Sequence, residues 1–165
     1  MIGSRRLFAW VSLSAMCLLS LRVHGQVTSQ RLAAAPNEPQ NWLTYSGNYS
    51  STRYSPLDQI TPANVRNLKL QLVYQAPVAG NWQTTPLVVD GMMYITQRLN
   101  DVVALDAKLG RAFWIYRYTP AQDRVVCCGA NNRGLGLLGD TLFMGTLDAH
   151  LIAIDRHTGR EMWKT

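Results

Sequence analysis

The sequence predicts an all-β fold that forms part of a β-propeller, and three observations support this prediction. Residues 104–114 (ALDAKLGRAFW) and 153–163 (AIDRHTGREMW) share the pattern Ala-x-Asp-x-x-x-Gly-Arg-x-x-Trp at an offset of 49 positions. The same offset superposes the two apolar runs that precede each pattern. In both units, turn-forming residues separate short apolar runs of strand length. A repeat of this length with four short strands per unit is typical of a propeller blade.

Residues 1–25 have the pattern of a secretory signal peptide. Arg5 and Arg6 precede an apolar run that is too short for a comfortable transmembrane helix. Small residues near the end of this segment permit cleavage before Gln26. We therefore expect an exported protein with no integral membrane segment after cleavage, and an uncleaved amphipathic anchor is the alternative.

Cleavage changes both the charge and the cysteine content of the chain. The formal charge falls from +6 to +3, because the signal segment contains three arginines and no acidic residue. The remaining basic residues are scattered, without the basic and aromatic stripe that follows a phosphate backbone, so nucleic-acid binding has little support. Cleavage also removes Cys17, which leaves Cys127 and Cys128 in a compartment where thiols oxidise.

The mature chain begins with a segment of low regularity. We expect residues 26–40 to form a flexible lead-in and residues 41–165 to form the N-terminal part of a propeller domain. Residues 41–68 are polar and rich in aromatic side chains. Within them, Thr61 and Pro62 predict a short helix, because threonine is a good N-cap and proline fits the first helical position.

The first blade starts with a predicted β-hairpin. In residues 86–96 (PLVVDGMMYIT), Asp90-Gly91 lies between two apolar runs, which is a strong hairpin signal. Asp106 to Gly110 predicts the next tight turn, because the Asp side chain can accept backbone N–H groups and the Gly can take positive φ. Asp155 to Gly159 predicts the same turn in the second blade.

Trp114 and Trp163 end the two units, and we expect them to close each sheet and pack between neighbouring blades. A propeller buries its faces only when at least four blades surround the axis, whereas this chain has about two. We therefore expect the 165 residues to be the front part of a longer protein. A small protein that assembles by oligomerising is the alternative.

Residues 134–139 (GLGLLG) match the dinucleotide-binding fingerprint G-x-G-x-x-G. That motif binds a pyrophosphate only where a helix N-terminus follows it, and here the start of a strand follows at residue 140. We interpret these glycines as sites of close packing near a propeller axis.

Cys127 and Cys128 are adjacent in residues 125–134 (VVCCGANNRG). Adjacent Cα atoms lie ~3.8 Å apart, below the usual range for disulfide partners, so a bond between them would close a small, rigid and strained ring. From the residues alone, a partly buried thiol pair and a labile redox switch stay open. A metal site is a poorer hypothesis, since no C-x-x-C or histidine spacing accompanies the pair.

Several segments resemble the pyrroloquinoline quinone (PQQ) dependent, or quinoprotein, alcohol and methanol dehydrogenases. Residues 41–68 resemble the N-terminal entry of this family, and residues 104–114 and 153–163 are similar to its tryptophan-docking motif. Residues 127–134 (CCGANNRG) are similar to its vicinal-disulfide segment. The resemblance implies an eight-bladed propeller with PQQ near its axis and a calcium or lanthanide ion beside the quinone. It also implies oxidation of a primary alcohol, with cytochrome c or a similar protein as electron acceptor.

The resemblance also implies roles for four residues. Cys127 and Cys128 match the pair that forms a disulfide ring on one face of PQQ, and Arg133 matches an arginine that contacts the oxygen atoms of the cofactor. Gln83 stands where methanol dehydrogenases have a PQQ-contacting glutamate, which leaves a hydrogen-bonding group without the negative charge. The catalytic and metal-binding residues of the family fall beyond residue 165, so we expect none in this chain.

The leading hypothesis is therefore the N-terminal portion of a periplasmic PQQ-dependent alcohol dehydrogenase. A non-catalytic periplasmic propeller scaffold would share the Trp-closed blades, but it has no reason to keep a cysteine pair beside Arg133. A third hypothesis accepts the enzyme family and regards this chain as an inert truncated fragment.

Overall fold

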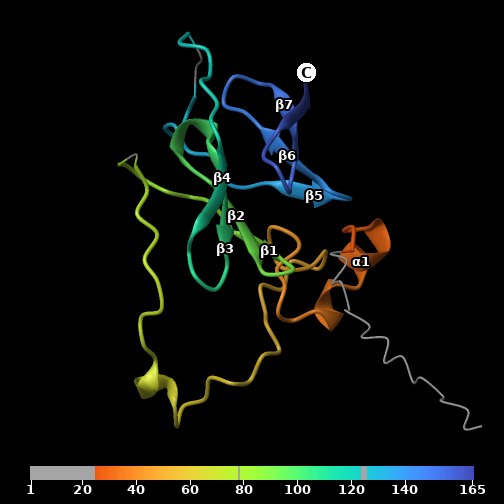
Figure 1. Ribbon diagram of the computed structural model, residues 1–165, viewed down its shortest axis with the longest axis vertical. Helices are drawn as coiled ribbons and strands as arrows, with labels where there is room; N and C mark the ends of the chain where they lie inside the picture. The colour runs from red at the N-terminus through yellow and green to blue at the C-terminus, as the bar shows by residue number, and fades with distance from the viewer. Residues whose placement is uncertain (1–24, 78, 124–125) are drawn as a thin grey trace, which may run out of the picture.

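The computed structural model of the protein describes residues 25–77, 79–123 and 126–165, which contain two four-stranded antiparallel sheets (Figure 1). The predicted signal peptide thus lies outside the described residues, apart from Gly25. The strand order is β1-β2-β3-β4 in one sheet and β5-β6-β7-β8 in the other, so each strand pairs with its neighbour in sequence. Two such meanders are two propeller blades, which confirms the predicted fold class.

The two sheets repeat each other closely. The first contains β1 (Leu87–Val89), β2 (Met92–Thr96), β3 (Val102–Asp106) and β4 (Ala112–Tyr116). The second contains β5 (Gly136–Leu138), β6 (Thr141–Gly145), β7 (Leu151–Asp155) and β8 (Glu161–Lys164). Every strand of the second sheet starts 49 positions after its counterpart, and both sheets have a register shift at the same point, after Ala104 and after Ala153. The repeat predicted from sequence is therefore also a repeat of backbone pairing.

The predicted turns form in both sheets. Asp90 and Gly91 have φ values of 53° and 82°, as a two-residue type I′ hairpin requires. Asp106 Oδ1 accepts the backbone N–H groups of the two residues Lys108 and Leu109 at 2.8 and 2.9 Å. Asp155 Oδ1 accepts the corresponding pair in the second sheet, at 3.0 and 2.8 Å.

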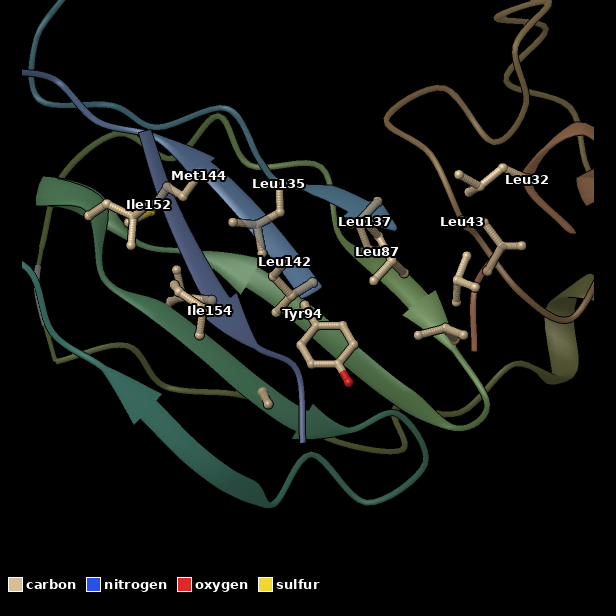
Figure 2. Packing of buried hydrophobic residues seen from close by; sticks show 14 of the residues in the cluster. Leu32, Leu43, Leu87, Tyr94, Leu135, Leu137, Leu142, Met144, Ile152 and Ile154 are labelled. Carbon is tan, nitrogen blue, oxygen red and sulfur yellow. The ribbon is translucent and has the colours of Figure 1, made fainter. Parts of the chain in front are cut away.

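The main hydrophobic core lies between the facing surfaces of the two sheets (Figure 2). Alternate residues of a strand point to opposite faces, so one set of side chains from each sheet meets the other sheet. The buried members of this core are Val27, Leu32, Ala35, Leu43, Leu87, Val89, Tyr94, Val102, Ala104, Leu135, Leu137, Leu142, Met144, Ile152 and Ile154. On the other face of the first sheet, Ile95, Val103 and Leu105 form a smaller cluster.

Trp114 packs between the two sheets, as predicted. Its Nε1 donates a hydrogen bond to the carbonyl of Arg156 at 3.2 Å, and its ring centroid lies 5.9 Å from that of Tyr94. Gly159 in the second sheet approaches the indole so closely that a Cβ atom there would lie 2.6 Å from the ring. The counterpart Trp163 is 43% exposed, because no described segment covers it.

Residues 26–40, the predicted lead-in, form short helices against the sheets. Thr28 caps α1 (Ser29–Ala33) through a 3.1 Å bond from a backbone N–H to its side chain, and η1 (Ala35–Asn37) follows. Val27 is fully buried and forms two backbone hydrogen bonds, of 3.1 and 2.8 Å, with the turn between β5 and β6. The segment packs against the sheets because its few apolar side chains complete the core between them.

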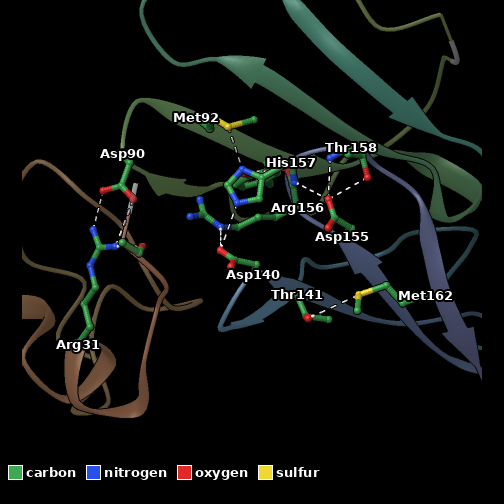
Figure 3. A network of polar contacts seen from close by, with 12 residues as sticks. Arg31, Asp90, Met92, Asp140, Thr141, Asp155, Arg156, His157, Thr158 and Met162 are labelled. Atoms are coloured by element: carbon green, nitrogen blue, oxygen red, sulfur yellow. Dashed lines mark hydrogen bonds and ion pairs between the residues drawn. The ribbon is translucent and has the colours of Figure 1, made fainter. Parts of the chain in front are cut away.

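Arg31 ties the same segment to the first sheet. Its guanidinium lies 2.8 Å from the carboxylate of Glu38 and 2.6 Å from that of Asp90, in the β1–β2 turn (Figure 3). The hydrogen bonds to Glu38, and then those to Asp90, raise the pKa of Arg31 above its usual value. These ion pairs are partly buried, and they join the segment around α1 to the β1–β2 turn of the first sheet.

The short helix predicted at Thr61 is wrong in its extent and its cap. The segment forms a turn followed by η2 (Val65–Asn67), with no side-chain cap. Asn64 Oδ1 accepts the backbone N–H of Thr61 at 2.7 Å, so the side chain of Asn64 organises the turn in place of a threonine cap. None of the helices in the described part of the chain is long and apolar enough to cross a bilayer.

The GLGLLG segment forms β5 and the turn after it, and β6 follows, which confirms that it is not a dinucleotide-binding motif. Gly134 has a φ of 139°, and a Cβ atom at this position would lie 3.3 Å from the carbonyl oxygen of Thr85. The glycine therefore permits close contact between the segment before β1 and the segment before β5.

Candidate functional site

Cys127 and Cys128 lie between β4 and β5 and are joined by a disulfide, with their Cα atoms 3.8 Å apart. Both residues are exposed. Asn131 Nδ2 donates a hydrogen bond to the carbonyl of Cys128 at 3.2 Å, and Gly129 has a φ of 80°, which favours glycine. The chain therefore turns directly after the ring, and the ring lies at the surface of the protein.

Two hollows meet beside this ring, with volumes of about 150 and 420 Å³. Asn131, Arg133 and Leu147 line both of them. The smaller hollow is also lined by Val126, Cys127, Cys128 and Gly129. The larger one is also lined by Tyr45, Asn132, Gly134, Leu135, Gly145 and Thr146. None of these lining residues is acidic. We call the combined lining the Cys–Arg surface.

Arg133 lies at the junction of the two hollows, and its side chain is exposed. Its carbonyl accepts the backbone N–H of Thr85 at 3.1 Å, which holds the main chain against the segment before β1. Within the described part of the chain, no carboxylate forms an ion pair with the Arg133 guanidinium. The guanidinium therefore keeps its planar set of donors available for a ligand with negatively charged oxygen atoms.

Gln83 is the one predicted site residue that lines neither hollow. Its side chain is exposed, and it precedes by two residues the Thr85 that is hydrogen-bonded to Arg133. The structure thus brings Cys127, Cys128 and Arg133 together, and Gln83 lies outside the two hollows. Its contact with a cofactor stays a prediction.

Tyr45 is a member of the Cys–Arg surface that our sequence reasoning missed. Its ring packs near Gly134, and the guanidinium carbon of Arg53 lies 5.1 Å from the ring centroid. Hydrogen bonds with Thr85 and then with Arg53 hold the pKa of the Tyr45 phenol below its usual value. Its only signal in the sequence is its place in the aromatic segment at residues 41–68.

Asp148 connects the β6–β7 turn, whose Thr146 and Leu147 line the Cys–Arg surface, to residues that follow β4. Its carboxylate accepts hydrogen bonds from Thr146 Oγ1 at 2.6 Å, from the backbone N–H of Ala121 at 2.8 Å and from the Tyr118 hydroxyl at 3.0 Å. Burial is the largest single influence and raises the pKa of Asp148, but these bonds and a contact with His150 together outweigh it and hold the pKa well below its usual range. The ionised carboxylate thus joins the β6–β7 turn to the residues that follow β4.

The Cys–Arg surface suits a planar ligand that is rich in oxygen. The disulfide ring offers a small rigid face, and the guanidinium offers donors in one plane that match carboxylate and carbonyl oxygens. Within the described ranges, no group of three or more His, Cys, Asp or Glu side chains is arranged to hold a metal ion.

Comparison with known proteins identifies the family to which this chain belongs. The PQQ family model, described as the β-propeller domain of glucose, ethanol and alcohol dehydrogenases, matches residues 42–164. The chain belongs to the PQQ-dependent alcohol dehydrogenase family. This confirms the resemblance found in the sequence.

Members of this family share both sequence and fold with the chain. The dehydrogenase subunit of the quinone alcohol dehydrogenase from Acetobacter aceti is 41% identical over 140 residues, which are 82% of this chain and 19% of that protein. The structure of quinohemoprotein alcohol dehydrogenase ADHIIG from Pseudomonas putida HK5 superposes with a TM-score of 0.79 and 40% identity, over 85% of this chain and 21% of that one. A europium-containing methanol dehydrogenase superposes with a TM-score of 0.77 and 36% identity, over 82% of this chain and 24% of that one.

The chain thus spans about a fifth of the length of the relatives it matches. All three of these PQQ-family relatives are named as dehydrogenases, which favours the enzyme family over a non-catalytic scaffold. The Cys127–Cys128 disulfide that the resemblance implied is present in the structure.

Proposed function

We propose that this chain is the N-terminal part of a periplasmic PQQ-dependent alcohol dehydrogenase that oxidises primary alcohols to aldehydes. The observation that carries the proposal is that the disulfide ring and Arg133 line the same hollow in a member of the PQQ family. The signal-like pattern of residues 1–25 supports export to the periplasm.

The residues of the Cys–Arg surface would hold the cofactor rather than react. PQQ, when bound, supplies the acceptor for the two electrons and two protons that an alcohol loses on becoming an aldehyde. The ring of Cys127 and Cys128 would support the cofactor, and Arg133 would donate hydrogen bonds to its carboxylate or carbonyl oxygens. Because no acidic residue lines the two hollows, an anionic cofactor meets no repulsion from their walls.

The proposal includes an ion and an electron acceptor. The family resemblance assigns a calcium or lanthanide ion to the quinone, with ligands beyond residue 165, and the similarity to a europium-containing methanol dehydrogenase supports an ion of this kind. A cytochrome c or a similar protein would then receive the electrons. When bound, such an ion would supply Lewis-acid chemistry at the reacting oxygen atoms, so turnover is expected to require it.

A comparison of two arginine variants tests this proposal in the full-length protein that contains the chain. Apo-protein is titrated with PQQ in the presence of calcium or a lanthanide, while cofactor absorbance and dye-linked oxidation of a primary alcohol are followed. A hydrogen bond to a charged group is worth ~1.5–3 kcal/mol, so Arg133→Ala is expected to raise the PQQ dissociation constant about tenfold or more.

Arg111→Ala is the matched control. Arg111 is also exposed, but it lies in the outer turn of the first blade, with its guanidinium carbon 5.6 Å from the ring centroid of Phe113. Loss of such a solvated contact is expected to leave PQQ affinity unchanged. Equal PQQ affinities for the two variants would contradict the role of Arg133. Failure of the reconstituted wild-type protein to oxidise any primary alcohol with either ion would contradict the reaction.

A further inference from the structure

Asn132, the residue before Arg133, connects three separate segments through one buried side chain. Only 8% of Asn132 is exposed. Its Nδ2 donates hydrogen bonds to Asn100 Oδ1 at 2.8 Å and to the carbonyl of Gly145 at 2.9 Å, and its Oδ1 accepts the backbone N–H of Gly134 at 3.0 Å. The first bond reaches the β2–β3 turn of the first sheet, the second reaches the end of β6, and the third closes the turn around Arg133.

Hydrogen bonds also hold the main chain just before and just after the Cα atom of Arg133. The carbonyl of Asn132 accepts a bond from Thr96 Oγ1 at 3.2 Å, and the carbonyl of Arg133 accepts the backbone N–H of Thr85 at 3.1 Å. Both donors belong to the first blade. Arg133 itself therefore has an anchored main chain and an exposed side chain, a combination that directs the guanidinium into the hollow.

Asn100, the hydrogen-bond partner of Asn132, is a polar residue that is buried in a turn. Asn100 ends η3 (Arg98–Asn100), is fully buried and has a φ of 73°. Burial of an amide costs free energy unless its hydrogen bonds are made, and Asn100 Nδ2 has no hydrogen-bond partner among the described residues. The hydrogen bond between these two buried amides holds the main chain beside Arg133 in one local geometry.

A defined geometry matters at this position because a free arginine side chain has many rotamers. Ordering such a side chain on binding lowers the affinity for a ligand, and a fixed main chain reduces the number of orientations that the guanidinium samples. A cofactor that binds an arginine whose orientation is already restricted therefore loses less affinity to this ordering.

We propose that Asn132 is a positioning residue for Arg133. Through its bonds to Asn100, Gly145 and Gly134, it locks together the two blades at the point where Arg133 enters the hollow. It thereby orients the guanidinium toward the cofactor. This inference rests on the proposed function, because it takes Arg133 as a residue that contacts PQQ.

A double-mutant cycle in the full-length protein tests this role, with PQQ titration of the apo-protein as the readout. Asn132→Ala is expected to raise the PQQ dissociation constant about tenfold when Arg133 is present, equivalent to the loss of one charged hydrogen bond. In the Arg133→Ala background, the same change is expected to raise it less than about twofold, because no guanidinium is left to position.

Asn41→Ala is the matched control for a general loss of stability. Asn41 also bridges two segments, with Nδ2 2.7 Å from Glu38 and Oδ1 3.0 Å from the backbone nitrogen of Asp90, but it lines neither hollow of the Cys–Arg surface. Its replacement is expected to lower the melting temperature and to leave PQQ affinity within about twofold of the wild type.

A second variant keeps the test decisive if Asn132→Ala does not fold. Asn100→Ala removes only one acceptor of Asn132, and it is expected to raise the PQQ dissociation constant about threefold, again only when Arg133 is present.

Each outcome separates this inference from the proposed function. If Arg133→Ala weakens PQQ binding but neither asparagine variant does, the positioning role is overturned and the function stands. If the asparagine variants weaken binding equally with and without Arg133, they act through general structure, and the positioning role is again overturned. If Arg133→Ala leaves PQQ binding unchanged, both the arginine contact and the positioning role are overturned.

Discussion

At the residue scale, two glycines show how one backbone conformation serves different purposes. Gly91 and Gly159 have φ values of 82° and 72°, so each adopts a conformation that side chains disfavour. A Cβ atom on Gly91 would meet no atom within 4 Å, whereas one on Gly159 would lie 2.6 Å from two atoms of the Trp114 ring. Gly91 is thus required only by its turn, while Gly159 is required by its turn and by the packing of the two blades.

This difference predicts unequal effects of two alanine substitutions. Gly91→Ala is expected to destabilise the protein by about 1–2 kcal/mol, the usual cost of the left-handed conformation. Gly159→Ala is expected to cost at least about 1 kcal/mol more, because the indole of Trp114 must also move. Thermal unfolding of the full-length variants, followed by tryptophan fluorescence, measures the two effects. Equal melting temperatures would show that the second blade does not rest on Trp114.

At the element scale, the stability of the β6–β7 turn depends on the negative charge of Asp148. The pKa of Asp148 is lower in the folded protein than in the unfolded chain, so its hydrogen bonds stabilise the fold at pH values above about 4. This stability is lost as the pH falls through the folded pKa, because the protonated carboxyl accepts these bonds less strongly.

Asp148→Asn is therefore expected to lower the stability by about 1–2 kcal/mol at neutral pH, and the difference from the wild type is expected to shrink below pH 4. Melting temperatures of both proteins over a series of pH values check this expectation. Asp58→Asn, which removes a carboxylate from an exposed position, is the control and is expected to leave the melting temperature nearly unchanged at neutral pH. A constant difference between Asp148→Asn and the wild type down to pH 3 would contradict the role of the charge.

The elements that could be predicted are those whose signals are local in sequence. Asp90-Gly91 specifies its own hairpin, and the spacing from Asp106 to Trp114 specifies a turn and a strand. The lead-in could not be predicted, because the partner of Val27 is a turn more than a hundred residues away. The same holds for Asn132, whose bond to Asn100 spans 32 positions and leaves no periodic pattern. Cys127, Cys128 and Arg133 were predictable only through the family resemblance.

At the scale of the whole molecule, the two sheets leave apolar side chains exposed. Met162 and Trp163 in β8 are 52% and 43% exposed, and Leu70 and Val73 are 81% and 74% exposed. The last two belong to a long segment that extends away from both sheets in Figure 1. Such surfaces are typical of repeat units that bury their faces against further units.

Residues 26–165 expressed alone in the periplasm are therefore expected to show no alcohol oxidation and to associate through their apolar surfaces. Dye-linked activity with added PQQ and calcium, together with size-exclusion chromatography, checks both expectations, and the full-length protein is the positive control. Turnover by residues 26–165 as a monomer would contradict them.

The contact between Trp114 and Gly159 also sets an order of events in biosynthesis. The glycine follows the tryptophan by 45 positions, so the indole leaves the ribosome well before the residue that covers it. At ~5–20 residues per second, the nascent chain displays an uncovered indole for roughly 2–9 seconds. The first blade is thus completed only when the second has been synthesised.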